Sequence, residues 1–209
     1  LFPDVTQLDL TGPFEVFHRL PDAEVQLVAA TAEPVVSEGG LAILPTRTFA
    51  DLGGCNILFV PGGPGVNEAM LDEELVSFLQ RHGERAQWVT SACTGALLLG
   101  AAGLLAGFEA ATHWASMEYL QAFGAWPKAE RVVVSGNRIT GGGVSAGIDI
   151  ALRIAEETHG HRVAEEIRAA IEYGQPPSDE VRDAVLRRME KMKEQRRRAV
   201  EQAARKLSS

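Results

Sequence analysis

The hydrophobic positions of this chain fall into two recurring patterns. Short apolar runs, such as residues 56–60 (NILFV) and 87–92 (QWVTSA), are typical of strands that are buried on both faces. Longer segments, such as 72–85 and 94–102, have apolar residues at helical spacing or are rich in Ala and Leu. The alternation of the two patterns over residues 1–160 predicts an α/β fold with a doubly wound, mostly parallel sheet and helices on both faces.

Weaker signals complete this pattern. Thr11 is the expected N-cap of a first helix, with Pro13 in its first turn. Glu38-Gly39-Gly40 and Ser135-Gly136-Asn137 each predict a turn between two strands. The remaining predicted elements are strands at 24–31 and 109–112 and helices at 114–123, 145–159 and 161–173.

The C-terminal part differs in composition from the rest. Gln175-Pro176-Pro177 interrupts the helical pattern, and Ser178 begins a last helix with one thin apolar stripe among many charges. From Ser178 onward there are ten basic and six acidic residues, a net charge of +4 that leaves −12 on the preceding residues. We therefore predict an α/β domain over 1–177 and a charged helical arm over 178–209 that packs on the body or on a dimer partner.

Composition narrows the classes of function. The chain has 209 residues, 45% of them apolar, which is enough to bury one full core. Its net charge of −8 argues against nonspecific nucleic-acid binding, and no run of 18 apolar residues marks a membrane span. Two cysteines, Cys55 and Cys93, favour free thiols in a reducing cytoplasm. The start at Leu1 reads as the end of a strand, so we expect an N-terminal piece to precede it.

The strongest candidate for chemistry is Cys93. It lies where the predicted strand 87–92 runs directly into the predicted helix 94–102, with small residues on both sides. This is the pattern of a nucleophile elbow, in which a tight turn exposes one side chain above the edge of a sheet. A helix N-terminus favours a thiolate over a thiol, so the pattern predicts a reactive cysteine. The alternative from this segment is a buried structural cysteine.

Two further groups are expected at the same edge of the sheet. Asp9 stands between two leucines near the predicted end of the first strand, where a carboxylate must find a partner or stay protonated. The turn at 61–65 (PGGPG) follows a buried strand, and the N–H groups of Gly62 and Gly63 can approach a ligand closely. Since chemistry in such sheets gathers at the carboxyl ends of strands, Asp9, the glycine turn and Cys93 predict one site.

Each of these residues also has a structural alternative. Asp9 can brace the start of the following helix through its side chain. His113 is a possible base for Cys93, but a single histidine beside a helix cap is more often a hydrogen-bonded structural group. No spacing of His, Cys and carboxylates suggests a metal site, and we expect no cofactor.

Five ordered motifs together resemble the DJ-1/PfpI superfamily, and within it the isocyanide hydratases. They are FPDVTQLDLTGPFEVF, FVPGGPG, VTSACTGALLLGAAGLLAG, Ala110-Ala111-Thr112-His113-Trp114 and ITGGGVSAGID, and the match runs from residue 1 to about 173. The resemblance implies a flavodoxin-like fold, a homodimer, Cys93 as nucleophile, Asp9 as its acidic partner and Thr94 as the threonine that follows the cysteine. The implied reaction adds water to an isocyanide and gives an N-substituted formamide through a cysteine thioimidate.

Two departures separate the chain from other branches that it resembles. Peptidase-like members have histidine directly after the cysteine, where this chain has Thr94, and redox or deglycase members have glutamate where it has Asp9. Other functions stay open: a sensor domain of the type found in AraC-type regulators, a redox-responsive protein, or a glyoxalase-like enzyme. Residues 175–209 have room for one long helix, which argues against a helix-turn-helix unit and DNA binding.

Overall fold

The computed structural model describes residues 1–175, 178–187 and 190. Most of the predicted C-terminal arm, at 188–189 and 191–209, therefore lies outside the described residues. Contacts between residues divide the chain into a first unit, Leu1–Ala155, and a second unit that begins at Glu156. The two units are described separately below.

The first unit is built on a four-stranded sheet whose strands lie in the order β5 (Ile57–Val60), β6 (Trp88–Ala92), β10 (Arg138–Gly141) and β9 (Val132–Ser135). The pairs β5–β6 and β6–β10 are parallel, and β9 pairs antiparallel with β10. Of the three parallel strands, β5 is wholly apolar, whereas β6 and β10 contain the buried Thr90 and Thr140, whose hydroxyls are hydrogen-bonded. This arrangement confirms the predicted α/β class with parallel sheet elements.

Shorter strands form three two-stranded ladders. They are β1 (Val28–Ala29) with β4 (Arg47–Thr48), β2 (Val35–Val36) with β3 (Ala42–Ile43), and β7 (Glu109–Ala110) with β8 (Trp126–Pro127). The predicted strand at 24–31 is thus reduced to two residues. Just before β1, the Leu27 N–H donates to the Thr46 hydroxyl, and the Leu27 carbonyl accepts the N–H groups of Thr46 and Arg47.

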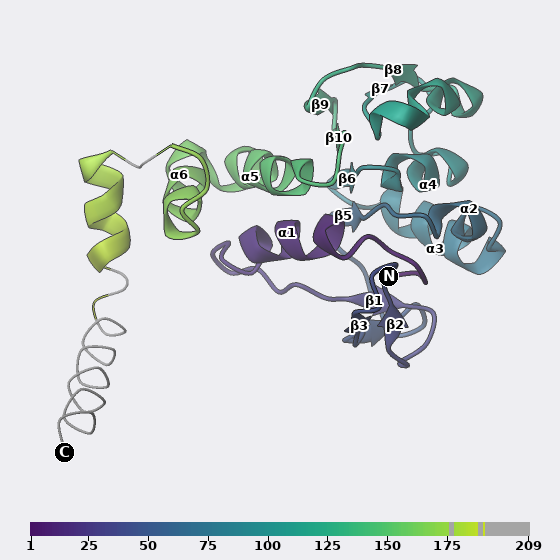
Figure 1. Cartoon of the computed structure of the whole chain (residues 1–209), viewed down its shortest axis with the longest axis horizontal. Coiled ribbons are helices and arrows are strands. Elements are labelled where there is room, and N and C mark those ends of the chain that lie inside the picture. The colour runs from purple at the N-terminus through teal and green to yellow at the C-terminus, as the bar shows by residue number, and fades with distance from the viewer. Residues whose placement is uncertain (176–177, 188–189, 191–209) are drawn as a thin grey trace. The chain divides into compact units, whose positions relative to one another are not determined.

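Helices lie on both sides of the sheet (Figure 1). On one side, α2 (Val66–Ala69), α3 (Glu73–Gly83) and α4 (Gly95–Ala101) enclose the largest apolar core, to which α4 contributes Leu97, Leu98 and Leu99. Asp72 caps α3, since its carboxylate accepts the N–H groups of Glu74 and Leu75. The other side is covered by α1 and by the first part of α5 (Ala146–His159).

The start of α1 was predicted wrongly. The helix runs over Gln7–Phe17 with Thr6 as its N-cap residue, so Thr11 and Pro13 lie inside it. A proline at this position removes one helical hydrogen bond, which is why the sequence favoured a later start. The helix is held there by packing, because the Pro13 ring lies against Gly147 of α5 and the Phe17 ring contacts Phe59 of β5. Consequently Asp9 lies in the first turn of α1 and does not follow a strand of the described chain.

The segment Trp114–Phe123, predicted as a helix, forms the 3₁₀-type helix η1, and His113 is its N-cap residue. The His113 ring nitrogen Nδ1 accepts the Ala115 N–H at 3.3 Å. This bond supports the structural role that was the favoured alternative for His113.

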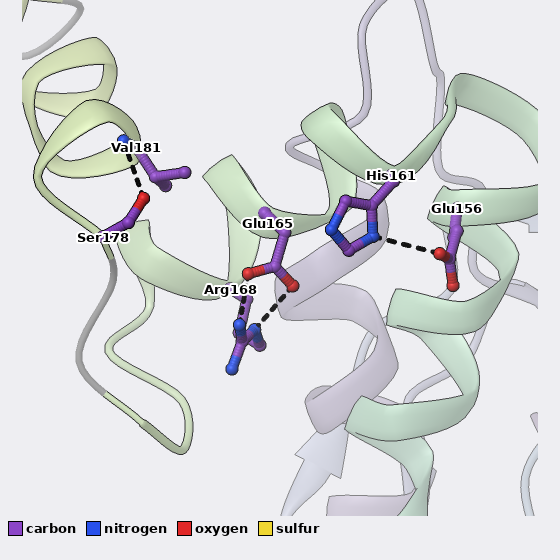
Figure 2. A network of polar contacts seen from close by, with 6 residues as sticks. All are labelled: Glu156, His161, Glu165, Arg168, Ser178 and Val181. Carbon is purple, nitrogen blue, oxygen red and sulfur yellow. Dashed lines mark hydrogen bonds and ion pairs between the residues drawn. The ribbon is translucent and has the colours of Figure 1, made fainter.

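The second unit contains the end of α5 and α6 (His161–Ala170). Ion pairs hold its turns together: His161 contacts Glu156 at 3.1 Å, and Arg168 pairs with Glu165 (Figure 2). Residues 179–187 are helical, and the Ser178 hydroxyl accepts the Val181 N–H at 3.4 Å, as expected for the predicted helix start. The predicted boundary between a domain at 1–177 and an arm at 178–209 stays a prediction.

Candidate active site

Cys93 occupies the single residue between β6 and the N-cap of α4. Its backbone has φ +53°, a left-handed conformation that costs a residue other than glycine about 1–2 kcal/mol. Two hydrogen bonds hold it there: the Cys93 N–H donates to the Gly141 carbonyl at 2.9 Å, and the Thr112 hydroxyl donates to the Cys93 carbonyl at 2.8 Å. The surrounding strands therefore impose the turn, and only 5% of Cys93 is exposed.

The Asp9 carboxyl faces this cysteine from the first turn of α1. It is fully buried, and its Oδ2 accepts the Gly62 N–H at 3.0 Å. Its Oδ1 makes no hydrogen bond of normal geometry among the described residues. The Cys93 thiol interacts with the carboxyl, so the structure brings together the two groups that the sequence placed at one site.

The glycine turn links Asp9 to the residue after the cysteine. The Gly63 N–H donates to Thr94 Oγ1 at 2.9 Å, and the Thr94 hydroxyl contacts the Gly63 carbonyl at 3.3 Å. A Cβ at position 62 would lie 2.6 Å from the Thr94 nitrogen and 2.9 Å from Asp9 Oδ2. Only glycine fits here, because the backbone must pass between the helix that supplies the acid and the helix that follows the cysteine.

Burial controls the protonation of this pair. Desolvation raises the pKa of Asp9 from 3.8 to about 7, against the lowering effects of the Gly62 N–H and of Cys93. Desolvation and then the negative charge of Asp9 raise the pKa of Cys93 to about 12, although the Thr94 N–H favours the thiolate. The two groups therefore share one proton between pH 7 and 12 and titrate as a coupled pair.

This result agrees with one expectation and differs from another. The acid form of Asp9 is favoured by burial, as its apolar neighbours indicated. The thiolate expected at Cys93 from its place beside a helix N-terminus is not favoured in the resting pair. The physical reason is that α4 is short and both groups are buried. The helix N-terminus therefore does not offset the rise in the Cys93 pKa that desolvation and the Asp9 carboxylate cause.

The two glycines of the turn, which the sequence placed together as N–H donors, have different partners. The Gly62 N–H donates to Asp9, and the Gly63 N–H donates to Thr94. His113 is occupied at the start of η1.

Sequence reasoning missed two supports of the cysteine, Thr112 and Gly141. Thr112 is next to His113, which drew attention as the ionisable residue of that motif. The available signal was that Thr112 ends an apolar run, where a buried hydroxyl must find an acceptor. Gly141 contributes a backbone carbonyl, for which sequence carries no direct signal.

The described part of the chain has neither a metal-binding cluster nor a membrane-spanning helix. No group of three or more His, Cys, Asp or Glu side chains among residues 1–175, 178–187 and 190 is placed to hold a metal ion. No helix in those residues is long and apolar enough to cross a membrane.

Comparison with known proteins gives a consistent picture. Isonitrile hydratase of Pseudomonas putida is 48% identical over 177 residues, covering 85% of this chain and 78% of that protein. The HTH-type transcriptional regulator GbdR of Pseudomonas aeruginosa is 28% identical over 141 residues, which are 66% of this chain and 38% of the regulator. The crystal structure of a THiJ/PfpI family protein from Pseudomonas syringae matches with a TM-score of 0.82 and 39% identity. The match covers 91% of this chain and 84% of that protein's chain.

The family model described as DJ-1/PfpI matches residues 1–157, the part that contains Asp9, the glycine turn and Cys93. The predicted resemblance is thereby confirmed: this chain belongs to the DJ-1/PfpI family.

Proposed function

We propose that this chain is an isocyanide hydratase, a hydro-lyase that adds water to an isocyanide and releases an N-substituted formamide. The observation that carries the proposal is that a nucleophile and a proton carrier, the Cys93 thiol and the Asp9 carboxyl, are buried together around the Gly62 turn. The 48% identity to the isonitrile hydratase of Pseudomonas putida supports it.

The reaction begins when Asp9 accepts the thiol proton of Cys93 and the sulfur attacks the terminal carbon of the isocyanide. That carbon then takes the proton back from Asp9, which gives a thioimidate in which carbon is bonded to sulfur and hydrogen and doubly bonded to nitrogen. Asp9, again a carboxylate, next deprotonates a water molecule that adds to this carbon, and nitrogen receives the proton. Collapse of the adduct breaks the carbon–sulfur bond and releases the formamide, and the hydroxyl proton of the adduct passes to Asp9, which restores the pair with one proton.

The active form in this scheme is the pair with one proton. With two protons, Asp9 cannot accept from the thiol; with none, no proton is available for the substrate carbon. The pKa values of about 7 for Asp9 and about 12 for Cys93 make the one-proton form the main one between these two pH values. Burial thus serves the reaction, although it does not favour a free thiolate.

The nearby groups position this pair. Gly62 fixes the carboxyl through its N–H, and the Thr94 hydroxyl anchors the glycine turn to the start of α4. The φ of Cys93 and the direct passage from β6 into α4 support a nucleophile elbow as the local geometry. We assign Cys93 and Asp9 to catalysis and Thr94, Gly62 and Gly63 to positioning.

The proposal extends to the assembly and the compartment. A homodimer is implied by the family resemblance, and a cytoplasmic location is supported by two free cysteines, Cys55 and Cys93. The substrate is a small molecule, and no cofactor enters the scheme.

A sensor function is the second candidate, because the chain also resembles part of a transcriptional regulator. Its match covers only 38% of that regulator, and an acid with a raised pKa beside a thiol favours catalysis over ligand binding alone. A glyoxalase-like activity would use the same nucleophile. Only the choice of substrate that is turned over distinguishes it from isocyanide hydration.

The deciding experiment incubates the purified chain with an aryl isocyanide and, separately, with methylglyoxal, and follows both by ultraviolet absorbance and product analysis. We expect formamide from the isocyanide and little turnover of methylglyoxal. Turnover of methylglyoxal alone would favour the glyoxalase function. Binding of an isocyanide without formamide would favour a sensor.

A further inference from the structure

The first turn of α1 has the sequence of a capping box but does not form one. Thr6 is the N-cap residue and Asp9 the third residue of the helix, so the hydroxyl would accept the Asp9 N–H and the carboxylate would accept the Thr6 N–H. Within the described residues neither bond forms. The Asp9 N–H donates to the Thr6 carbonyl at 3.0 Å, and the Thr6 N–H donates to the Gly62 carbonyl at 2.9 Å. Gly62 therefore bonds to both groups that the box would join: its carbonyl accepts the Thr6 N–H, and its N–H donates to the Asp9 carboxyl.

Glu38 takes the hydroxyl of Thr6. Thr6 Oγ1 donates to Glu38 Oε1 at 2.7 Å, across to the turn between β2 and β3. Backbone bonds fix the same turn to the segment before α1: the Glu38 N–H donates to the Val5 carbonyl at 3.2 Å, and the Asp4 N–H donates to the Val36 carbonyl at 2.9 Å. The Thr6 hydroxyl is therefore tied to the β2–β3 turn, while the Gly62 carbonyl takes the Thr6 N–H and the Gly62 N–H holds the Asp9 carboxyl.

The titratable groups that act on Asp9 come from two elements. One is Cys93, and the other is Glu38, whose negative charge opposes ionisation of the buried acid. The loop after β5 contributes the Gly62 N–H, and α5 brings only Gly147 to the Asp9 backbone, while Asp149 of that helix pairs with Arg131. Glu38 itself is exposed, so salt should screen its effect.

We propose that Glu38 is a positioning residue of this site: it takes the Thr6 hydroxyl, fixes the β2–β3 turn to the start of α1, and with its negative charge sets the pH at which the Asp9–Cys93 pair takes up a second proton. The inference rests on the proposed function, because a pair with one proton is the form assigned to catalysis.

The test compares Glu38→Gln, which keeps an acceptor for Thr6 and removes the charge, with Glu33→Gln, which removes the same charge from another exposed glutamate. Two readouts are followed against pH, at low salt and at about 0.5 M NaCl. They are kcat/KM for an aryl isocyanide and the rate of Cys93 alkylation by iodoacetamide, read from the mass of the peptide that contains Cys93.

In Glu38→Gln at low salt, we expect the acid limb of both profiles to shift to lower pH by a few tenths of a unit. A shift of this order is what one exposed charge produces. High salt should move the parent profile in the same direction and leave Glu38→Gln unchanged, and Glu33→Gln should match the parent. An unmoved limb in Glu38→Gln, or an equal shift in Glu33→Gln, would overturn the charge effect.

A second variant tests position. Glu38→Ala removes the acceptor as well, so kcat should fall severalfold with little change in KM, whereas Glu38→Gln should retain the parent kcat at its optimal pH. Equal kcat for all three proteins would overturn the positioning role. Alkylation needs no substrate, so it tests Glu38 even if the parent turns over no isocyanide, a result that would reject the proposed function alone.

Discussion

At the scale of single residues, burial sets the protonation of Asp9 and Cys93. A surface thiol beside a helix N-terminus would tend to ionise, but this pair has too little solvent to support two charges. The proton instead stays with the pair, where it is available to the substrate. The residue types were predictable from sequence; the balance between the helix N-terminus and desolvation was not, because it depends on how completely the fold covers both groups.

The pH dependence of turnover follows from this coupling. Since burial raises the pKa of Asp9 to about 7, kcat/KM should rise with pH as the carboxyl ionises, and should stay high until the thiol ionises near 12. A pH profile of kcat/KM with an aryl isocyanide measures this directly. Activity that decreases as pH rises through 7 would contradict the assignment of Asp9 as proton acceptor.

Asp9→Asn should separate activity from stability. The rate should fall by about 10²-fold or more, because the variant loses its proton carrier. The raised pKa of folded Asp9 means that its ionisation destabilises the fold above pH 3.8, fully so above 7. The variant should therefore gain up to about 4 kcal/mol of unfolding free energy above pH 7 and nothing at low pH. Urea unfolding at both pH values checks this, and an equal gain at both would exclude a buried charge as its cause.

At the scale of elements, the glycine turn, the start of α1 and the passage from β6 to α4 form one unit around the pair. Sequence predicted the last of these well, because an apolar strand and an Ala- and Leu-rich helix meet directly at Cys93. It misplaced the start of α1, since Pro13 looks like a first-turn residue and only tertiary contacts with Gly147 show why the helix tolerates it. It also did not distinguish Gly62 from Gly63, whose N–H groups donate to different residues, Asp9 and Thr94.

Gly62→Ala tests this unit. Its Cβ would lie 2.6 Å from the Thr94 nitrogen and 2.9 Å from Asp9 Oδ2, so the turn must move away from both helices. We expect a loss of activity of at least about tenfold and a loss of stability of about 1–3 kcal/mol. Gly39→Ala, where a Cβ meets nothing within 4 Å, is the matched control and should behave like the parent. Enzyme kinetics and thermal melting of both variants measure these effects. Parent-like activity in Gly62→Ala would show that the contact between Gly62 and Asp9 is unimportant for turnover.

At the scale of the whole molecule, charge is divided between a body of net −12 and a final segment of net +4. We propose that residues 178–209 act as a separate arm that supports assembly and solubility and takes no part in chemistry. The α/β class was predictable from the alternation of strands and helices, whereas the partner of the arm was not, because one thin apolar stripe does not identify the surface that it meets.

Deletion of residues 178–209 should therefore alter the sedimentation coefficient or the solubility of the protein before it alters kcat. Sedimentation velocity and turnover measured on the same sample provide the comparison. A truncated protein with the parent's assembly state and a much reduced kcat would place the segment in the site and reject a separate arm.

Turnover by Cys93→Ala tests covalent catalysis most directly. Alanine keeps the backbone turn at position 93 and removes only the sulfur, so thermal stability should stay within about 1 kcal/mol of the parent. With an aryl isocyanide, the parent should release formamide, and the folded variant should show none above the uncatalysed rate. Formamide release by the variant at a rate near that of the parent would contradict a thioimidate on Cys93.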